Sequence, residues 1–188
     1  MRKIVFLLIF LINSLFIFSE EKSISTIKTL TMKVEETILL NSQKKKSEYT
    51  LKFIKPNFLR KDVISPELNK GEIYIYNDGK KIVYLPLFDQ VSEEESKEGT
   101  EILETINYLF EKEQKDKNFK KEYYSKKLNE ILLEDGTKIK IDNFKKYDGY
   151  LLPQKFDIFT NEGHIGTLYI KEYIVNQKLS KEELSKYD

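Results

Sequence analysis

The chain has 188 residues, no cysteine, one histidine and nearly balanced charge, with 32 basic and 31 acidic side chains. The lack of cysteine excludes disulfides, thiolate metal sites and a lipid-modified cysteine, and charges of both signs are interspersed, which argues against nucleic acid as a partner. A chain of this length has room for one ordinary domain with a single core.

The first segment predicts export. Two basic residues precede an apolar run from Ile4 to Phe18, and polar sequence resumes at Ser19. These are the parts of a secretory signal peptide, so we expect residues 1–19 to be cleaved and residues 20–188 to form one exported domain. The alternative is an uncleaved membrane anchor, because bulky Ile17 stands two residues before the cut. The run is nevertheless short of the roughly 20 apolar residues that span a bilayer.

The sequence after the predicted signal peptide has the pattern of β-strands. Apolar and polar side chains alternate over residues 29–38, which predicts a strand with one buried and one solvated face. A lysine-rich turn is expected around residues 43–46. Two further strands are expected at residues 49–54 and 58–64, separated by Lys55-Pro56-Asn57, because proline interrupts a sheet rather than lying inside it.

Tight turns then divide the chain into hairpins. Asp78-Gly79 and Asp135-Gly136 are dipeptides that tolerate the positive φ angles of a primed turn, and Asn161-Glu162-Gly163 is a longer turn of the same kind. The strands expected on either side of these turns are 72–76 with 81–85, 128–133 with 138–141, and 156–159 with 165–175. Turns at this spacing predict one continuous antiparallel sheet that curls.

One clear helix interrupts the strands. Its apolar positions follow the 3.6-residue period, and they are Ile102, Leu103, Ile106, Leu109 and Phe110. Thr100 is the candidate N-cap. The acidic residues 93–98 before it are expected to form a solvated loop, and shorter helical turns are expected within residues 21–27 and 180–187.

The sequence contains no recognisable catalytic centre. His164 is the one histidine, and its place beside two glycines in a predicted turn indicates a surface residue. No histidine pair or close carboxylate cluster has a metal-ligand spacing, no serine has the context of a nucleophile elbow, and no glycine-rich phosphate loop is present. We therefore predict no catalytic residue, no metal site and no cofactor.

Large apolar side chains are abundant, with 12 tyrosines, 12 phenylalanines and no tryptophan. Residues 73–76 and 82–85 are apolar on both faces of their predicted strands. Either the helix packs on one face while the other is partly covered, or the curled sheet and the helix enclose an apolar cavity. Arg60 is the only arginine after residue 19, among 29 lysines. It is either a surface residue or a site that needs the planar, bidentate guanidinium.

Several short motifs lie between Lys55 and the end of the chain. They are Lys-Pro-Asn-Phe-Leu-Arg at 55–60, Asn-Asp-Gly at 77–79, Tyr-Leu-Pro at 84–86 before Gln90-Val91, Pro153 before a strand at 154–160, and Asn176. In this order they resemble the periplasmic carriers of outer-membrane lipoproteins, the LolA type. The chain departs from that pattern in its lack of tryptophan and in a charged insertion at residues 93–117.

The resemblance implies a mainly β fold with covering helices (α+β), a half-open antiparallel β-barrel whose helical lid encloses an apolar cavity. It also implies a monomeric, non-enzymatic periplasmic carrier that holds the acyl chains of lipoproteins or lipids. Such a carrier would receive its cargo from an inner-membrane transporter and pass it to an outer-membrane acceptor. Periplasmic lipid-binding sensors share this fold, and they are the alternative.

The resemblance and the predicted strands together suggest which residues form the cavity. The side chains expected to line it are Leu51, Phe53, Phe58, Ile73, Ile75, Val83 and Leu85 on the sheet, and Ile102, Leu103, Ile106 and Phe110 on the helix. Strand parity decides these assignments, and an error of one residue would move a side chain to the opposite face. Lys55 and Arg60 match the basic positions of the family, where a basic residue near the barrel mouth bonds the lid backbone, and the sequence leaves open which of them has that role.

Overall fold

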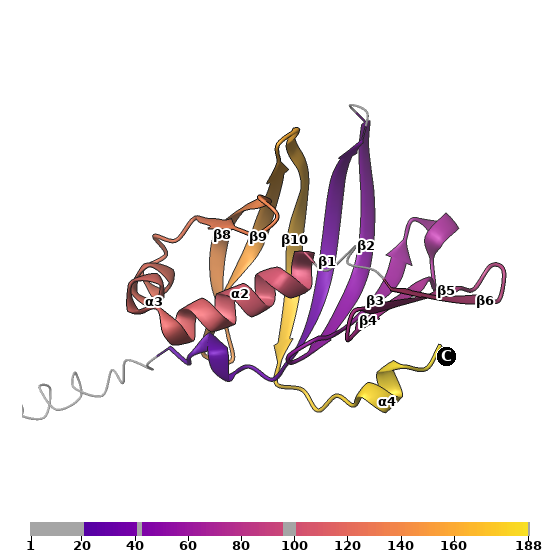
Figure 1. Ribbon diagram of the computed structural model, residues 1–188, viewed down its shortest axis with the longest axis horizontal. Coiled ribbons are helices and arrows are strands. Elements are labelled where there is room, and N and C mark those ends of the chain that lie inside the picture. The colour runs from indigo at the N-terminus through magenta and orange to yellow at the C-terminus, as the bar shows by residue number, and fades with distance from the viewer. Residues whose placement is uncertain (1–20, 41–42, 96–100, 188) are drawn as a thin grey trace, which may run out of the picture.

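The computed structural model describes residues 21–40, 43–95 and 101–187, so the predicted signal peptide lies outside the described residues. Ten strands form one antiparallel sheet in the order β6-β5-β4-β3-β2-β1-β10-β9-β8-β7, which is curved and not closed (Figure 1). The strands are β1 (Thr29–Leu40), β2 (Gln43–Ile54), β3 (Phe58–Ser65), β4 (Ile73–Asn77), β5 (Lys80–Leu85), β6 (Gln90–Glu95), β7 (Glu130–Leu132), β8 (Lys138–Tyr147), β9 (Tyr150–Thr160) and β10 (Gly163–Val175). The predicted fold class, a half-open antiparallel barrel with covering helices, is confirmed.

The sheet consists of two meanders joined by one long-range pair. Strands β1 to β6 follow each other across one half, and β7 to β10 follow each other across the other. β10 then pairs with β1, so that Leu30 lies opposite Val175. The predicted turn at Asp78-Gly79 is present between β4 and β5, with φ angles of 51° and 79°, as a primed turn requires.

Helices cover the sheet on both sides. They are η1 (Ile24–Thr26), η2 (Glu67–Asn69), α2 (Glu101–Lys115), α3 (Lys117–Tyr124) and α4 (Lys181–Leu184). α2 is the predicted helix, and its proposed cap Thr100 lies outside the described residues. α3 was not predicted, and its N-cap is Asp116, whose carboxylate accepts hydrogen bonds from the backbone N–H groups of Asn118 and Phe119.

Two charged segments that were expected to be turn or loop belong to strands. The lysine-rich residues 43–46 begin β2 and pair with the end of β1. Acidic residues 93–95 end β6, where Glu93 binds Lys80 at 2.6 Å and Glu94 binds Lys81 at 3.0 Å. Charged side chains on a solvated strand are stabilised by partners on the neighbouring strand, which a pattern of apolar residues does not reveal.

Pro153 also differs from expectation, because it lies inside β9 rather than before a strand. It pairs with Phe144 of β8, whereas the ladder between β9 and β10 ends at Lys155. The proline therefore occupies a part of β9 that has a paired strand on one side, which is where a missing N–H is tolerated.

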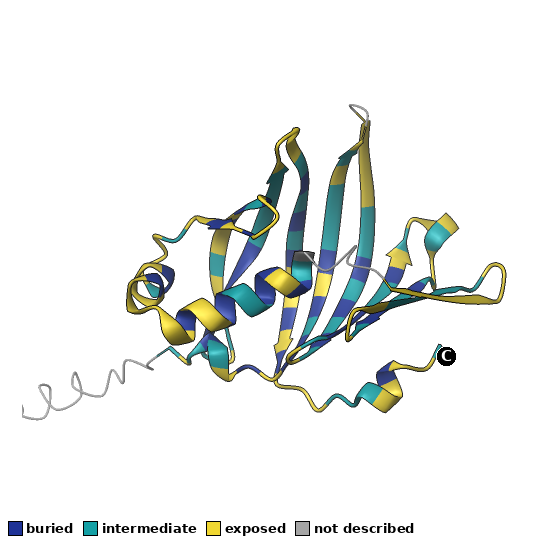
Figure 2. Cartoon of the chain, viewed as in Figure 1, coloured by how far each residue is buried: buried dark blue, intermediate teal, exposed yellow. Residues whose placement is uncertain are grey.

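Buried side chains form clusters on both faces of the sheet. Figure 2 shows how buried residues are distributed along the strands and helices. We call the face that bears Leu30 and Leu51 the lid face, because α2 crosses it. We call the face that bears Phe58 and Ile75 the tail face, because Leu184 of α4 packs against it. The larger cluster lies between the lid face and α2, and the smaller one lies under the end of the chain.

Candidate functional site

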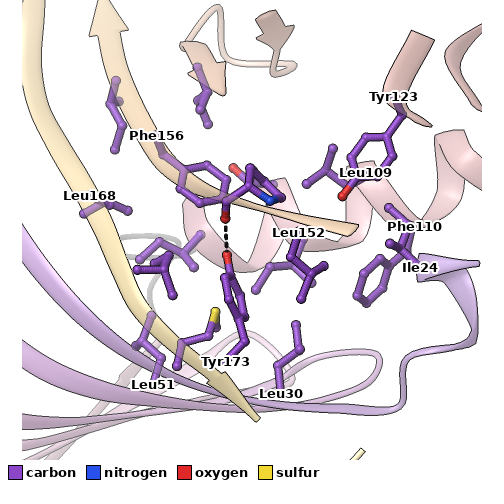
Figure 3. Close-up of a pocket in the computed structure, with 18 residues that line it drawn as sticks. Ile24, Leu30, Leu51, Leu109, Phe110, Tyr123, Leu152, Phe156, Leu168 and Tyr173 are labelled. Atoms are coloured by element: carbon purple, nitrogen blue, oxygen red, sulfur yellow. Dashed lines mark hydrogen bonds between the residues drawn. The ribbon is translucent and has the colours of Figure 1, made fainter. Parts of the chain in front are cut away.

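An apolar cavity lies between the lid face and α2 (Figure 3). The sheet contributes side chains of β1, β2, β8, β9 and β10, among them Leu30, Leu51 and Leu168, and α2 contributes Leu109 and Phe110. η1 and α3 close it with one residue each. Its wall is therefore built almost wholly from hydrocarbon and aromatic rings, which suits an apolar ligand.

The two tyrosines of the cavity wall direct their hydroxyl groups into the protein backbone. Tyr173 Oη donates to the carbonyl oxygen of Pro153 at 2.6 Å (Figure 3), and Tyr123 Oη donates to that of Leu151 at 2.7 Å. Burial raises the pKa of both hydroxyls well above the ordinary value, so they stay neutral. With their polar ends bonded, the rings add apolar surface to the wall.

The cavity is small in this arrangement. Its volume is about 50 Å³, whereas pockets that hold drug-sized ligands measure roughly 300–1,000 Å³. An acyl chain would fit only after α2 moves away from the sheet. The contacts that hold α2 in place therefore decide whether the cavity can bind anything.

The C-terminal part of α2 is held by a buried carboxylate. Glu113 accepts a hydrogen bond from Ser23 Oγ at 2.7 Å and binds Lys120 of α3 at 3.1 Å, and its own side chain is fully buried. Burial by itself would raise the pKa of Glu113, but these hydrogen bonds outweigh burial and hold the pKa below the ordinary value of 4.5. Glu113 thus fixes one part of α2 to η1 and α3.

The middle of α2 is held by contacts with the turn between β2 and β3. Asn107 Nδ2 donates to the carbonyl oxygen of Pro56 at 2.9 Å. Lys55 Nζ lies 5.3 Å from the ring centroid of Phe110 and donates to the carbonyl oxygen of Ser25 at 3.1 Å. These contacts are exposed to solvent, and exposed contacts of this kind contribute little free energy.

Arg60 has a different place from Lys55. It lies on the tail face, where it is 6% exposed, and Nε binds Asp62 at 2.7 Å. Its NH1 group donates to the carbonyl oxygens of Leu184, at 2.8 Å, and of Lys186. Arg60 therefore holds the end of the chain, and of the two basic residues only Lys55 contacts α2.

The cavity contains four of the residues expected there. Those that line it are Leu51, Ile102, Ile106 and Phe110. Phe53 and Leu103 are buried in the same cluster without lining the cavity, and the rings of Phe53 and Phe110 meet edge to face with centroids 6.2 Å apart. Val83 and Leu85 lie half-buried on β5, which two strands separate from β2.

Three expected cavity residues lie on the opposite face of the sheet. They are Phe58, Ile73 and Ile75, which pack with Leu184 on the tail face. The register of the β2–β3 hairpin places Leu59, not Phe58, opposite Phe53. That register depends on the geometry of the connecting turn, and an error of one residue there inverts the assignment of every following strand in the hairpin.

The sequence prediction missed the half of the cavity that β8, β9 and β10 provide. Phe156, Leu168, Ile170 and Tyr173 line it. Leu168 and Ile170 alternate with polar or exposed residues in the predicted strand 165–175, and this alternation is the signal that could have found them.

The described residues contain no group of three or more histidine, cysteine, aspartate or glutamate side chains that could hold a metal ion. His164 is exposed at the beginning of β10, as predicted. In the part of the chain that the structure describes, no helix has the length and apolar character needed to cross a membrane.

Comparisons with known proteins identify the fold. No protein-family model matches the chain, and no curated protein is significantly similar to it in sequence. Among solved structures, a domain described as a putative outer membrane lipoprotein-sorting protein from Vibrio parahaemolyticus matches with a TM-score of 0.59 at 13% identity, over 84% of this chain and 89% of that one. A LolA superfamily protein from Nitrosomonas europaea matches with a TM-score of 0.57 at 10% identity, over 89% and 94%.

A third structure, a DUF1329 family protein from Desulfovibrio piger, matches with a TM-score of 0.58 at 12% identity, over 86% of this chain and 91% of that one. These matches cover most of each chain, and they agree on one architecture. The chain has a LolA-like fold, in which an open antiparallel barrel carries a helical lid.

Proposed function

We propose that the protein is a periplasmic carrier, and not an enzyme, that binds the acyl chains of lipoproteins or lipids between its sheet and α2. One observation carries the proposal: the side chains between the sheet and α2 form an apolar cavity whose tyrosine hydroxyls are bonded to backbone carbonyls. The LolA-like fold supports it, because one match is described as a lipoprotein-sorting domain. Residues 1–19 would direct export. The residues that would contact the acyl chain are Leu51, Ile102, Ile106 and Phe110.

The energy of such binding is large enough to require a movable lid. Burial of acyl carbons contributes about 0.8 kcal/mol per methylene, or roughly 10 kcal/mol for a long chain. When α2 moves away from the sheet, its apolar side chains lose their contacts with the sheet. The bound acyl chain then provides new apolar contacts in their place. Part of the binding energy is thus offset by lid opening, so that the cargo can be passed to an acceptor with higher affinity.

The contacts of the lid suggest how it opens. The proposal assigns Lys55 the role of the basic gate, because its ammonium group contacts both Phe110 and the backbone of η1. Loss of the exposed contacts at Lys55 and Asn107 would free the middle of α2, while Glu113 keeps its C-terminal part attached. The carrier would work as a monomer between an inner-membrane donor and an outer-membrane acceptor.

Native mass spectrometry of the mature domain, purified under mild conditions from the periplasm of its own cell, tests the proposal directly. We expect a one-to-one adduct with an acylated protein or lipid. The purified domain should also take up an uncharged apolar dye such as N-phenyl-1-naphthylamine. Absence of every acylated species, together with no uptake of the dye, would contradict the proposal.

A pair of aspartate variants separates the cavity from the rest of the core. Phe110→Asp places a charge in the cavity wall, and we expect it to abolish dye uptake by more than it lowers stability. Leu184→Asp is the matched control, because Leu184 is also buried, at 8% exposure, but lies on the tail face. It should lower the free energy of unfolding and leave dye uptake intact. Parallel loss of stability and uptake in both variants would show that Phe110 is only a core residue.

A further inference from the structure

Charged and hydroxyl side chains interrupt the apolar lid face beside the cavity. Lys61 on β3 lies directly opposite the cavity residue Leu51, and Glu36 on β1 lies directly opposite the cavity residue Leu168. Tyr49 on β2 lies between them, two residues from Leu51 on the same face. We call Glu36, Tyr49 and Lys61 the polar cluster. It borders the cavity on two sides.

Glu36 lies beside both donors of the polar cluster, but neither donor makes a well-formed hydrogen bond to it. Lys61 Nζ lies 3.7 Å from Glu36 Oε2 and 3.9 Å from the ring centroid of Tyr49, and neither contact is a hydrogen bond. Among the residues that the structure describes, Lys61 donates no hydrogen bond, and the buried Tyr49 Oη has no hydrogen-bond partner of acceptable geometry. Glu36, in contrast, accepts a hydrogen bond from Ser47 Oγ at 3.0 Å.

This arrangement is costly unless something completes it. A buried hydroxyl without an acceptor destabilises a fold, and an ammonium group on an apolar sheet face loses part of its hydration. The side chains of Lys61 and Glu36 keep 26% and 16% of their surface exposed, so an entering group can reach these two side chains, and Tyr49 is fully buried beside them. An oxygen acceptor placed there would satisfy both donors at once.

We propose that the polar cluster is a head-group subsite, in which Lys61 and Tyr49 donate hydrogen bonds to the carboxylate or ester oxygens at the head of an acyl chain whose tail lies in the cavity. The inference rests on the proposed function, because it needs the chain to occupy the cavity. It adds a preference that the apolar wall cannot supply. The cavity selects for hydrocarbon, and the cluster selects for acyl oxygens attached to it.

Competition for bound N-phenyl-1-naphthylamine tests the subsite. The competitors are dodecanoate, monododecanoyl glycerol and 1-dodecanol, which share a twelve-carbon chain and differ in the head. In Lys61→Met we expect the dissociation constant of dodecanoate to rise about tenfold, as loss of a charge-assisted hydrogen bond predicts. The constants for the dye and for 1-dodecanol should stay within about twofold of wild type.

The arms of the experiment distinguish the two sources of acyl oxygen. A loss confined to dodecanoate assigns the subsite to a free carboxylate, and a loss for monododecanoyl glycerol as well assigns it to acyl oxygens in general. Uptake of the dye by wild type with an unchanged dodecanoate constant in Lys61→Met would overturn this inference and leave the proposed function intact. Failure of wild type to bind the dye would overturn both.

A double variant separates head recognition from a purely structural ion pair. If Lys61 served only to neutralise Glu36, then Glu36→Gln together with Lys61→Met would restore both stability and dodecanoate binding. The subsite predicts that the double variant regains stability but keeps the weakened dodecanoate binding. Glu36→Gln alone should bind dodecanoate at least as well as wild type, because it removes a negative charge that would repel the carboxylate of the ligand. Restored binding in the double variant would contradict the proposal.

Discussion

The same sheet carries one cover on each face, α2 on the lid face and the end of the chain on the tail face. α2 has 15 residues and encloses a cavity, whereas α4 has four residues and packs directly on Phe58 and Ile75. The shorter cover is fastened at its end from a buried position, because Arg60 binds the backbone at Leu184. The middle of the longer cover has exposed contacts to a turn.

This difference indicates which cover is built to move. A helix of four residues does not form by itself in water, so α4 depends on what holds it. The guanidinium of Arg60 occupies the C-terminal end of α4, where cations are favoured, and Asp62 compensates its buried charge. α2 is longer and packs its apolar stripe against the sheet, and an apolar ligand can replace that packing. Under the proposed function, the tail is therefore a fixed cover and α2 is a removable one.

The largest expected effect comes from loss of the tail anchor. Arg60→Met leaves Asp62 half-buried with Lys52 as its remaining partner and removes two bonds to the tail backbone, so we expect the free energy of unfolding to fall by about 3 kcal/mol. Urea denaturation measures it. Arg60→Lys is the control, and it should recover less than half of the loss because an ammonium group lacks the planar fork. Both variants should still take up the dye. If Arg60→Met lost dye uptake while remaining folded, the segment that contains α4 would take part in ligand binding.

A smaller effect is expected at the fixed part of the lid. Glu113→Gln weakens the hydrogen bonds to Ser23 and Lys120, and we expect a loss of about 2 kcal/mol at pH 7. The pKa of Glu113 in the folded protein lies below 4.5, so its carboxylate adds stability above that pH and loses it as the pH falls through the folded value.

Denaturation of wild type and Glu113→Gln between pH 3 and pH 7 checks the sign. The difference in the free energy of unfolding between the two proteins should stay constant down to about pH 5 and become smaller at lower pH. A gap that widens in acid would mean that the protonated form is the one held in the folded state. The C-terminal part of α2 would then be weakly held at pH 7, and the contrast with the firmly held tail would be lost.

Local chemistry accounts for what the sequence predicted correctly. The primed turn at Asp78-Gly79 needs two residues that tolerate positive φ, and the stripe of α2 needs only its own period. Each of these two signals is contained within a few neighbouring residues of the sequence. The start of β2 at residues 43–46 was missed because its lysines are stabilised by pairing with β1. A local sequence pattern contains no information about that pairing.

The candidate site was harder to predict because its residues are brought together over long distances. Arg60 matched a basic family position, but its partner carbonyl belongs to Leu184, 124 residues later in the chain. Ile73 and Ile75 have the composition of cavity residues, and only the register of β3 with β4 places them on the tail face. β9 and β10 provide much of the wall, and the expected cavity residues included none of their side chains.

The smallest expected change in stability lies at the removable part of the lid. Asn107→Ala removes the hydrogen bond to Pro56 on the exposed side of α2, and we expect the free energy of unfolding to fall by only about 0.5 kcal/mol. The dissociation rate of a bound dye should nevertheless rise severalfold, because this bond breaks each time α2 leaves the sheet. Stopped-flow displacement measures the rate. Lys115→Ala is the matched control and should leave the rate unchanged, since the one ion pair of Lys115 within the described ranges is with Glu111 of the same helix. An unaltered rate in Asn107→Ala would mean that α2 opens elsewhere along its length, and that its middle is as fixed as the tail.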